Sequence, residues 1–409
     1  MQRIRSAYRQ VATGPEARVF WLKVVIAGAM ASGMLLSPKL WLSDRSYPLT
    51  PVSDLLPGIP SPGDRVWFGT LLALLVGVAL LPRPRTLIVL FVLLAGLLSL
   101  WDQSRWQPWF YQYLLMLVPF VFYSWTRSDA ADRRRKDLLG ACRVIVAATY
   151  IWSGLQKFNV SFTTNVYPWL IEPFLPESAR SLAESGGLVI PVMETAIGLG
   201  LLVPSLRPVA AFGAVAMHAA ILLCLGPLGH DWNSVVWPWN VAMPLFAAIL
   251  FGRTPGVSFR EVTWPGRGVR HWAALALVGI LPGLSFADRW DAYLSAALYS
   301  GNTLQADLVL SDEAQARLPD AVRQYSDPWG HNRYRVSLAD WSVGELNVPP
   351  YPARRVFRNI ARSVGRWAEE PGDVVLVIRE RPDWLSGDRE TSEEDAWDLD
   401  DGRPASPAE

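Results

Sequence analysis

The sequence has few cysteines and few charged residues for its length. Cys142 and Cys224 are the only cysteines in 409 residues, and both lie inside long apolar stretches. Two such thiols argue against a disulfide framework and against a thiolate metal site, so we expect no metal. Charged residues make up only 18% of the chain and hydrophobic residues 51%, which argues against a soluble enzyme. We also expect no nucleic-acid partner.

Long apolar stretches fill the first 286 residues instead. Each is close to the roughly 20 residues that a helix needs to cross a bilayer. They cover residues 19–36, 66–81, 86–100, 109–125, 138–155, 187–203, 209–228, 235–251 and 271–286. The sequence therefore predicts an all-α polytopic membrane bundle over residues 19–286, with about nine transmembrane helices. Eight is the alternative count, because the third stretch is short.

Basic residues accumulate in alternate connections between these stretches. They include Arg3, Arg5, Arg9 and Arg18, then Arg83 and Arg85, then Arg133, Arg134, Arg135 and Lys136, then Arg207, and then Arg253, Arg260, Arg267 and Arg270. Lys and Arg favour cytoplasmic loops, so we expect a multi-pass protein of the cell membrane with a cytoplasmic N-terminus, residues 1–18. No small-residue cleavage site follows the first stretch, which we interpret as a retained helix. The chain after residue 286 is then extracytoplasmic.

The composition changes after the last stretch. Residues 303–310 alternate apolar and polar as a half-buried strand does, and 334–338 and 373–378 read as further strands. Residues 312–325 and 353–367 read as helices. We therefore expect a small extracytoplasmic α+β domain over residues 300–380. Residues 381–409 are acidic with little to bury, and we expect this tail to be disordered.

Polar residues inside the apolar stretches are the candidate site. Lys157 ends one stretch, where it can snorkel to the headgroups, find a partner, or serve as a neutral amine base. Glu194, His218 and Asn240 each lie in the outer half of one of the next three stretches. Such groups often face a cavity and mark functional sites. The structural alternative is that Glu194 and His218 pair to lock two helices, with Asn240 adding a hydrogen bond.

The segment before Lys157 carries a resemblance. Residues Tyr150-Ile151-Trp152-Ser153-Gly154-Leu155-Gln156-Lys157 resemble the aromatic-rich Gly-x-x-Lys stretch of the vitamin K-dependent γ-carboxylases and of their bacterial relatives, the horizontally transferred transmembrane (HTTM) domain proteins. The more distant DoxX-like membrane proteins share a Gly-x-x-Lys element. This chain is much shorter than animal carboxylases and lacks the large outer region that holds their substrate.

The resemblance implies a cofactor and a set of roles. The cofactor is a reduced quinone of the vitamin K type, which Lys157 deprotonates, with His218, Glu194 and Asn240 as further catalytic residues. Gly154, Trp152, Trp237 and Trp239 are then the expected cofactor contacts. The implied reaction is quinol-dependent epoxidation coupled to carboxylation or to a related proton abstraction.

Two readings without that chemistry remain open. One is a non-catalytic, DoxX-like subunit of a membrane redox complex, with a membrane protein as partner. The other is a transporter or lipid-binding protein, although no inverted repeat is recognisable. All three readings place the protein in the lipid bilayer.

Overall fold

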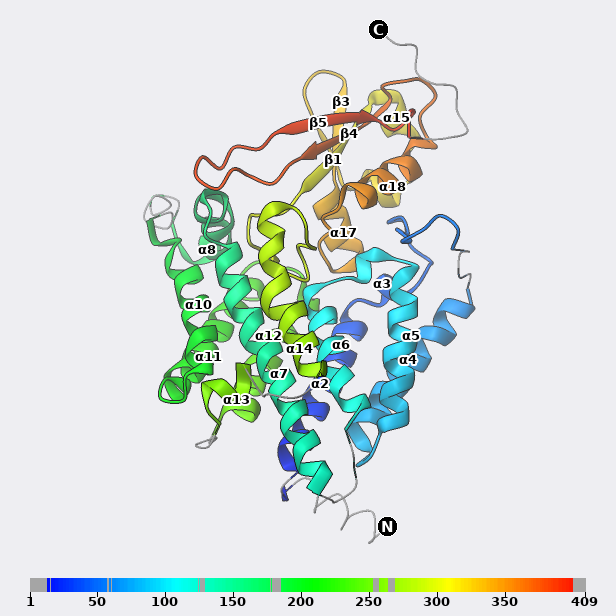
Figure 1. The fold of residues 1–409 in the computed structure, drawn as a ribbon. Helices are drawn as coiled ribbons and strands as arrows, with labels where there is room; N and C mark the ends of the chain where they lie inside the picture. Colours follow the sequence, from blue (N-terminus) through cyan, green and yellow to red (C-terminus); the bar gives the residue numbers. More distant parts are fainter. Residues whose placement is uncertain are drawn as a thin grey trace.

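The computed structural model describes residues 13–14, 16–56, 59, 61–123, 125, 129–176, 178, 185–252, 257–263 and 269–399. A bundle of helices forms the larger part of the molecule, and a small sheet with its own helices sits on one end of it (Figure 1). The long helices of the bundle are α2 (Ala17–Leu36), α4 (Gly63–Leu80), α5 (Arg85–Leu100), α6 (Pro108–Val121), α7 (Asp129–Gln156), α10 (Val189–Leu202), α11 (Arg207–Leu225) and α12 (Trp237–Phe251). Shorter segments connect them: α3 (Pro38–Trp41), η1 (Gln103–Arg105), η2 (Phe162–Val166), α8 (Tyr167–Ile171), η3 (Glu172–Phe174), η5 (Ser234–Val236), α13 (Phe259–Thr263), α14 (Val269–Ala274), η6 (Leu275–Ile280) and η7 (Leu281–Ala287).

Five of the described helices are long and apolar enough to cross a membrane. They are Ala17–Leu36, Gly63–Leu80, Asp132–Gln156, Arg207–Leu225 and Ser234–Phe251. The other four expected spans are shorter apolar helices: Arg85–Leu100, Pro108–Val121, Val189–Leu202 and His271–Ala287. The helical membrane bundle is thus confirmed with five candidate spans, and the count of nine stays a prediction.

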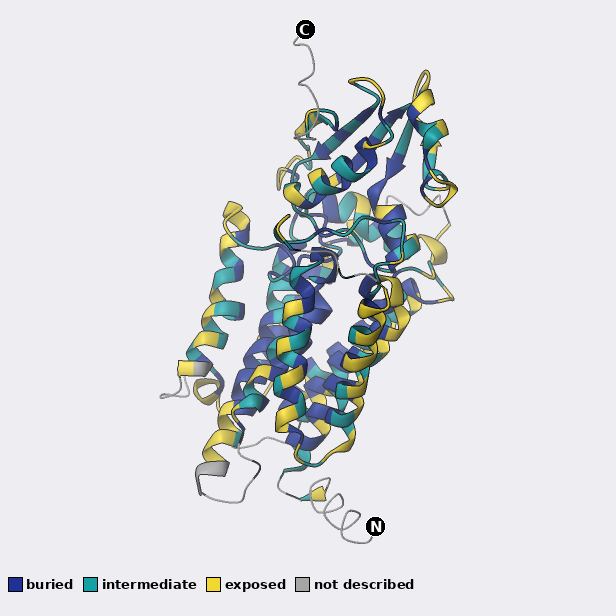
Figure 2. Ribbon diagram, turned by 90° about the vertical axis from the view of Figure 1, so that its right-hand side faces the viewer, coloured by how far each residue is buried: buried dark blue, intermediate teal, exposed yellow. Residues whose placement is uncertain are grey.

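The outward faces of the bundle carry large apolar side chains. On α11, Phe212 is 75% exposed and Val209 is 72% exposed. Figure 2 shows exposed residues along the outer sides of the helices, while buried residues line the inside of the bundle. Exposed apolar area of this kind is costly in water and favourable against hydrocarbon. The exposure pattern is therefore that of a membrane protein.

A five-stranded antiparallel sheet forms the core of the C-terminal unit. The strands are β1 (Gln305–Ser311), β2 (Ser326–Pro328), β3 (Arg333–Ser337), β4 (Val374–Arg379) and β5 (Thr391–Asp395), in the order β2-β3-β1-β4-β5. Its helices are α15 (Asp312–Arg317), α16 (Asp320–Arg323), α17 (Leu338–Leu346) and α18 (Arg354–Gly365). Leu308 and Leu310 of β1 and Leu376 of β4 are fully buried, as the alternation of a sheet with one covered face requires.

Three expected strands and one expected helix match elements of this unit, and one expected helix is wrong in detail. The helix expected over 312–325 is two short helices, because Leu318 is extended and Pro319 precedes α16. A residue before proline is disfavoured in the helical region, so the first helix ends there. The helix α17 and the edge strands β2 and β5 were not expected.

The expectation of a disordered tail from residue 381 is wrong for residues 391–395. Strand β5 pairs with β4 in register, with Thr391 opposite Arg379 and Asp395 opposite Val375. One acidic side chain of this edge strand has a cationic partner on α18: Arg358 donates two hydrogen bonds to Glu394, at 2.6 and 2.7 Å. Pairing to a neighbouring strand and to this arginine therefore compensates for the low apolar content.

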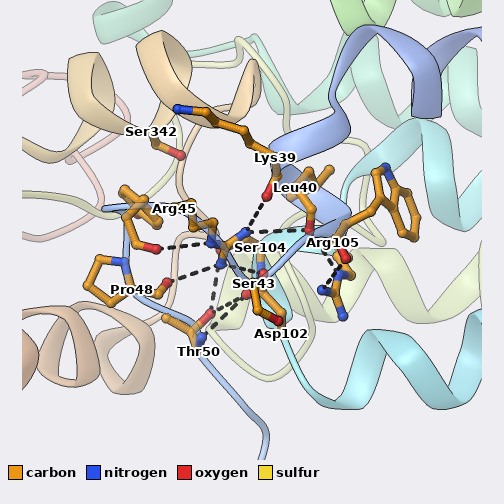
Figure 3. A network of polar contacts seen from close by, with 12 residues as sticks. Lys39, Leu40, Ser43, Arg45, Pro48, Thr50, Asp102, Ser104, Arg105 and Ser342 are labelled. Carbon is orange, nitrogen blue, oxygen red and sulfur yellow. Dashed lines mark hydrogen bonds and ion pairs between the residues drawn. The ribbon is translucent and has the colours of Figure 1, made fainter. Parts of the chain in front are cut away.

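A buried polar network joins the loop after α3 to η1 beneath the C-terminal unit (Figure 3). Arg45 forms an ion pair with Asp102 at 2.6 Å, with side chains 1% and 0% exposed. Thr50 donates a hydrogen bond to the same carboxylate at 2.9 Å. Burial alone would raise the pKa of Asp102, but the charges of Arg45 and Arg105 hold it below its ordinary value. This network stiffens the loop on which the C-terminal unit rests.

Candidate functional site

The last turns of α7 and the residue that follows it supply three polar side chains to the interior of the bundle. Tyr150, Ser153 and Lys157 lie three and seven positions apart, a spacing that puts them on the same side of a helix. Lys157 lies directly beyond the last residue of α7 and is 7% exposed. Lys157 therefore does not snorkel to the surface, because its partners lie within the bundle.

Lys157 is bound to Glu194 of α10 and to Ser153. Its Nζ atom donates to Glu194 Oε2 at 2.7 Å, to Ser153 Oγ at 2.6 Å and to the Ser153 carbonyl oxygen at 3.0 Å. Ser153 Oγ in turn donates to Glu194 Oε1 at 3.0 Å. An ammonium has three donors, and all three are used here. The arrangement is that of a charged ion pair with a bridging hydroxyl rather than of a free amine.

His218 of α11 lies in a second chain of hydrogen bonds. Its Nδ1 atom is 2.7 Å from Asn240 Oδ1, and Asn240 Nδ2 donates to the Val236 carbonyl at 2.9 Å, which orients the amide. An amide oxygen only accepts, so Nδ1 carries the proton of a neutral ring and Nε2 is the acceptor. Tyr150 Oη lies 2.8 Å from Nε2 and is then the donor. The chain runs from the Tyr150 hydroxyl through His218 to Asn240.

These pairings differ from the structural alternative drawn from the sequence. Glu194 pairs with Lys157 and not with His218, whereas His218 pairs with Tyr150 and Asn240. Asn240 is held by α12, and Pro238 lies in the first turn of this helix, where a missing N–H costs nothing. The helix therefore presents Asn240 from a regular first turn.

Both groups line one cavity, which we call the inner cavity. It has a volume of about 90 Å³, and Tyr150, Ser153, Lys157, Glu194, His218 and Asn240 are among its lining residues. Apolar side chains such as Ile190, Ile221 and Leu225 form much of its remaining wall. The structure therefore brings the four predicted catalytic residues together around a small apolar space, while their catalytic role stays a prediction.

Of the predicted cofactor contacts, only Trp239 lines the inner cavity. It donates from Nε1 to Gln112 Oε1 at 2.8 Å. Trp237 donates to the Leu225 carbonyl at 3.1 Å instead, and Trp152 packs on Phe286, with ring centroids 6.1 Å apart. Neither ring is among the lining residues of this cavity.

Gly154 serves helix packing rather than ligand contact. A Cβ atom at this position would lie 2.7 Å from the Pro191 carbonyl oxygen and would also clash with Thr195. A Cβ at Gly198 of α10 would lie 2.8 Å from the Ala147 carbonyl oxygen of α7. Small residues on both helices thus allow α7 and α10 to approach closely. This approach brings Glu194 within reach of Lys157.

Sequence reasoning did not assign roles to Tyr150 and Ser153, although both lie in the segment that drew attention to Lys157. The signal was present, because both share a helical face with Lys157. Tyr299, which also lines the inner cavity, was not predicted as a site residue either. It lies in an irregular segment with a left-handed backbone, φ +53°, and no periodic pattern marks it.

A second space, the outer cavity, lies between the bundle and the sheet. Its volume is about 510 Å³, and Asp307, Arg335 and Arg379 of the sheet contribute to its wall. Val166, Leu298 and Tyr299 line both the outer and the inner cavity. These three side chains therefore lie between the polar site and a larger space beneath the sheet.

A metal ion requires a set of donor side chains that lie close together. Among the described residues, no group of three or more His, Cys, Asp or Glu side chains is placed to hold a metal ion. Cys142 and Cys224 are both free. The candidate site therefore consists of an ion pair and a hydrogen-bonded imidazole.

Comparison with protein families gives one match. Residues 135–230 are similar to the family model of methylamine utilisation protein MauE. The match includes Lys157, Glu194 and His218 but ends before Asn240. No curated protein and no solved structure matches the chain.

This finding overturns the family resemblance drawn from the sequence. The segment around Lys157 belongs to a stretch similar to MauE, and neither the vitamin K-dependent γ-carboxylase nor the HTTM family matches. The Gly-x-x-Lys element is too short to identify a family. Its glycine, Gly154, is required by the packing of two helices and therefore gives no evidence of a shared function. What the match supports is a membrane protein.

Proposed function

We propose that this membrane protein binds the hydroxyl-bearing head of a small lipid-soluble ligand of the quinol class in its inner cavity. One observation carries the proposal: an ion pair and a histidine face a common apolar space inside the bundle. Intramembrane charges in such a position favour a functional site over a purely structural one. The apolar wall suits the ring of the ligand, and the polar groups suit its oxygens.

The proton of the ligand has a defined destination in this proposal. Lys157 first passes one proton from Nζ to Glu194 Oε2, across the 2.7 Å hydrogen bond between them. This transfer leaves a neutral amine and a neutral carboxylic acid. The amine then accepts the proton of the ligand hydroxyl, so the ligand becomes an anion and the pair holds one additional proton. Ser153 bridges the pair and keeps the two groups aligned.

The second chain of hydrogen bonds positions the other ligand oxygen. The Tyr150 hydroxyl and His218 line the same cavity as the ion pair. Asn240 sets the tautomer of the His218 imidazole. A ligand oxygen that replaces Nε2 as the partner of Tyr150 receives a hydrogen bond from its hydroxyl. This role makes Tyr150 and His218 binding groups rather than bases.

We further propose nine spans, with the N-terminus cytoplasmic and the C-terminal unit outside. The alternation of basic residues supports this orientation, and four shorter apolar helices are available in addition to the five long ones. In this orientation the inner cavity is in the outer half of the membrane. The outer cavity then offers a route between the site and the extracytoplasmic side.

A second candidate is a non-catalytic membrane component that serves methylamine utilisation, as the name of the matching family states. The complete pairing of the Lys157 ammonium favours it, because such a pair also holds α7 to α10. In this case no ligand enters the inner cavity.

Binding of a short-chain quinol to the purified full chain separates the two candidates. We expect a saturable fall in tryptophan fluorescence, since Trp239 lines the cavity, and a red-shifted absorption band from the bound anion. Lys157→Ala and Lys157→Arg should lose the anion band, because a guanidinium stays protonated. Lys23→Arg is the matched control, since Lys23 is also buried but lines neither cavity.

Two results would contradict the proposal. Absence of quinol binding by the unaltered chain leaves the non-catalytic candidate. An unchanged anion band in Lys157→Arg removes Lys157 as the base.

A further inference from the structure

A third space, which we call the basal cavity, lies at the end of the bundle opposite the sheet. It has a volume of about 430 Å³ and is formed by α6, the first half of α7, and the segment α14–η6. Its wall is largely apolar and includes Leu115, Val118, Leu138 and Leu277. The proposed function uses neither this cavity nor any residue that lines it.

Charged and polar groups are concentrated at one part of this wall. Arg134 and Asp137 of α7 line the cavity, and both are exposed. Arg134 belongs to an unbroken run of four cations, residues 133–136. Within that run Arg135 is paired with Asp132 at 3.0 Å. One cation, Arg134, and one carboxylate, Asp137, therefore line the charged part of the wall, and further cations flank Arg134 in the sequence.

His271 is a buried polar group deeper in the same wall. It is 2% exposed, and the Val262 backbone lies close enough to the ring to act as one partner, although neither ring nitrogen makes a hydrogen bond of regular geometry within the described part of the chain. An imidazole has two ring nitrogens to satisfy, so at least one buried nitrogen is left for an external partner. Its Nδ1 atom would lie 3.5 Å from a Cβ placed on Gly140 of α7.

The depth of His271 relative to Arg134 indicates how the polar groups of a ligand in this cavity would be ordered. Gly140 follows Arg134 by six residues, so His271 lies about 9 Å further into the bundle along α7. A phospholipid has the same order of groups: an anionic phosphate, then ester oxygens that accept hydrogen bonds, then acyl chains. Basic pockets between transmembrane helices suit such headgroups.

We propose that the basal cavity binds an anionic phospholipid. Arg134 contacts the phosphate, His271 donates to an oxygen at the level of the glycerol esters, and an acyl chain occupies the apolar part against α6 and η6. Asp137 lies beside the phosphate and weakens the binding. The site is separate from the inner cavity and does not depend on the quinol proposal.

Retention of lipids by the purified full chain tests this inference. The detergent-solubilised protein is incubated with phosphatidylglycerol or with phosphatidylcholine of the same acyl chains, and the lipid retained per protein is measured by native mass spectrometry. We expect preferential retention of phosphatidylglycerol. Arg134→Gln should reduce it about fivefold, the effect of about one basic contact near a membrane surface.

The controls use neighbouring residues. Arg133→Gln removes the same charge at a residue that does not line the cavity. It should change retention less than twofold, compared with about fivefold (~1 kcal/mol) for Arg134→Gln. Asp137→Asn should raise retention. Ala141→Phe fills the cavity from α7 and should abolish it, and His271→Leu should lower it while the protein still folds, because leucine also suits a buried position.

Three outcomes would overturn the inference. The first is equal retention of the two lipids. The second is an equal loss in Arg133→Gln and Arg134→Gln, which would mean that surface charge alone attracts the lipid. The third is displacement of phosphatidylglycerol by millimolar glycerol phosphate, which would identify a site for a soluble phosphate instead.

Discussion

Two buried lysines at opposite ends of the bundle show how different partners give the same residue different roles. Lys23 of α2 is 0% exposed and Lys157 beyond α7 is 7% exposed. Lys23 donates to the backbone carbonyls of Val78 and Ala79, at 2.8 and 2.9 Å, in the last turn of α4. Lys157 donates instead to the Glu194 carboxylate and the Ser153 hydroxyl.

The two ammonium groups differ in whether their hydrogen-bond partner can accept a proton from them. Carbonyl oxygens at the end of a helix attract a cation through the helix dipole but cannot take its proton. A carboxylate can take it, and Glu194 faces the inner cavity, where the proposed ligand would supply another. Burial is therefore common to both lysines, and the acidic partner beside a cavity is what distinguishes Lys157.

The largest effect should come from removing one member of the ion pair. Glu194→Leu leaves the Lys157 charge buried without a counter-ion, and we expect a loss of about 3–5 kcal/mol in the free energy of unfolding. The double variant Lys157→Met, Glu194→Leu should recover most of it, because no unpaired charge remains. Unfolding midpoints in detergent provide the measurement. A double variant less stable than either single one would contradict this account.

The next effect concerns the attachment of the C-terminal unit close to Lys157. Ending the chain at Glu380 removes strand β5 and the hydrogen bonds from Arg389 to the carbonyls of Gly301 and Thr303, at 2.6 and 2.8 Å. We expect a loss of about 3 kcal/mol, the scale of a few hydrogen bonds at roughly 1 kcal/mol each. Leu385→Ser is the control, since this side chain is 89% exposed. Equal thermal midpoints for the truncated and full chains would show that the strand is dispensable.

A second attachment of the C-terminal unit, to the loop after α3, depends on Glu345 of α17. Its carboxylate accepts hydrogen bonds from the Ser46 and Tyr47 backbone, each at 2.7 Å, and pairs with Lys39 at 3.3 Å. Burial would raise the pKa of Glu345, but the hydrogen bonds from Ser46 and Tyr47 and the charge of Lys39 hold it below its ordinary value. Hydrogen bonds to a charged group contribute about 2 kcal/mol, so Glu345→Gln should cost about that much at pH 7.

The pH dependence of this attachment has a definite sign. Because the pKa of Glu345 is lower in the folded state, its stabilisation is complete above its ordinary pKa of about 4.3 and is lost as the pH falls through the folded value. Thermal midpoints measured from pH 7 to pH 3 should therefore fall less steeply in Glu345→Gln than in the unaltered chain. Parallel curves would exclude Glu345 as the source of the pH dependence.

The smallest effect should come from Lys23 itself. Lys23→Met removes a cation from the end of α4, and we expect a loss of about 1 kcal/mol, the scale of a charge at a helix terminus. Quinol binding should not change in this variant. A change in binding as large as that of Lys157→Ala would remove the distinction between the two lysines.

The sequence located the candidate site but not its internal pairing. Lys157, Glu194, His218 and Asn240 stood out because each is polar within an apolar stretch, and all four line the inner cavity. Which of them pair depends on how the helices are rotated and how closely they approach. The contact of Gly154 with Thr195 brings Glu194 to Lys157, and no pattern in either helix alone specifies that contact.

The C-terminal unit shows the same division. The alternation in β1 and the apolar run in β4 predicted strands, because each reflects a face that the strand itself must bury. Strand β5 was not predicted because it is stabilised by neighbouring elements. Glu394 is bound by Arg358, and the backbone of β5 pairs with β4. A strand stabilised by partners distant in sequence carries no local signal.

The sequence by itself determined that this is a helical membrane protein with a small mixed unit after the bundle. Hydropathy and the alternation of apolar and polar residues are properties of short stretches of sequence, so helices and strands can be predicted from them without knowledge of the fold. Only the tertiary structure decided that Lys157 is an ion-paired ammonium, that His218 bonds Tyr150 and Asn240, and that residues 391–395, three of them acidic, form a strand. These outcomes depend on distances between distant segments, because a hydrogen bond or an ion pair requires two groups within about 3 Å of each other.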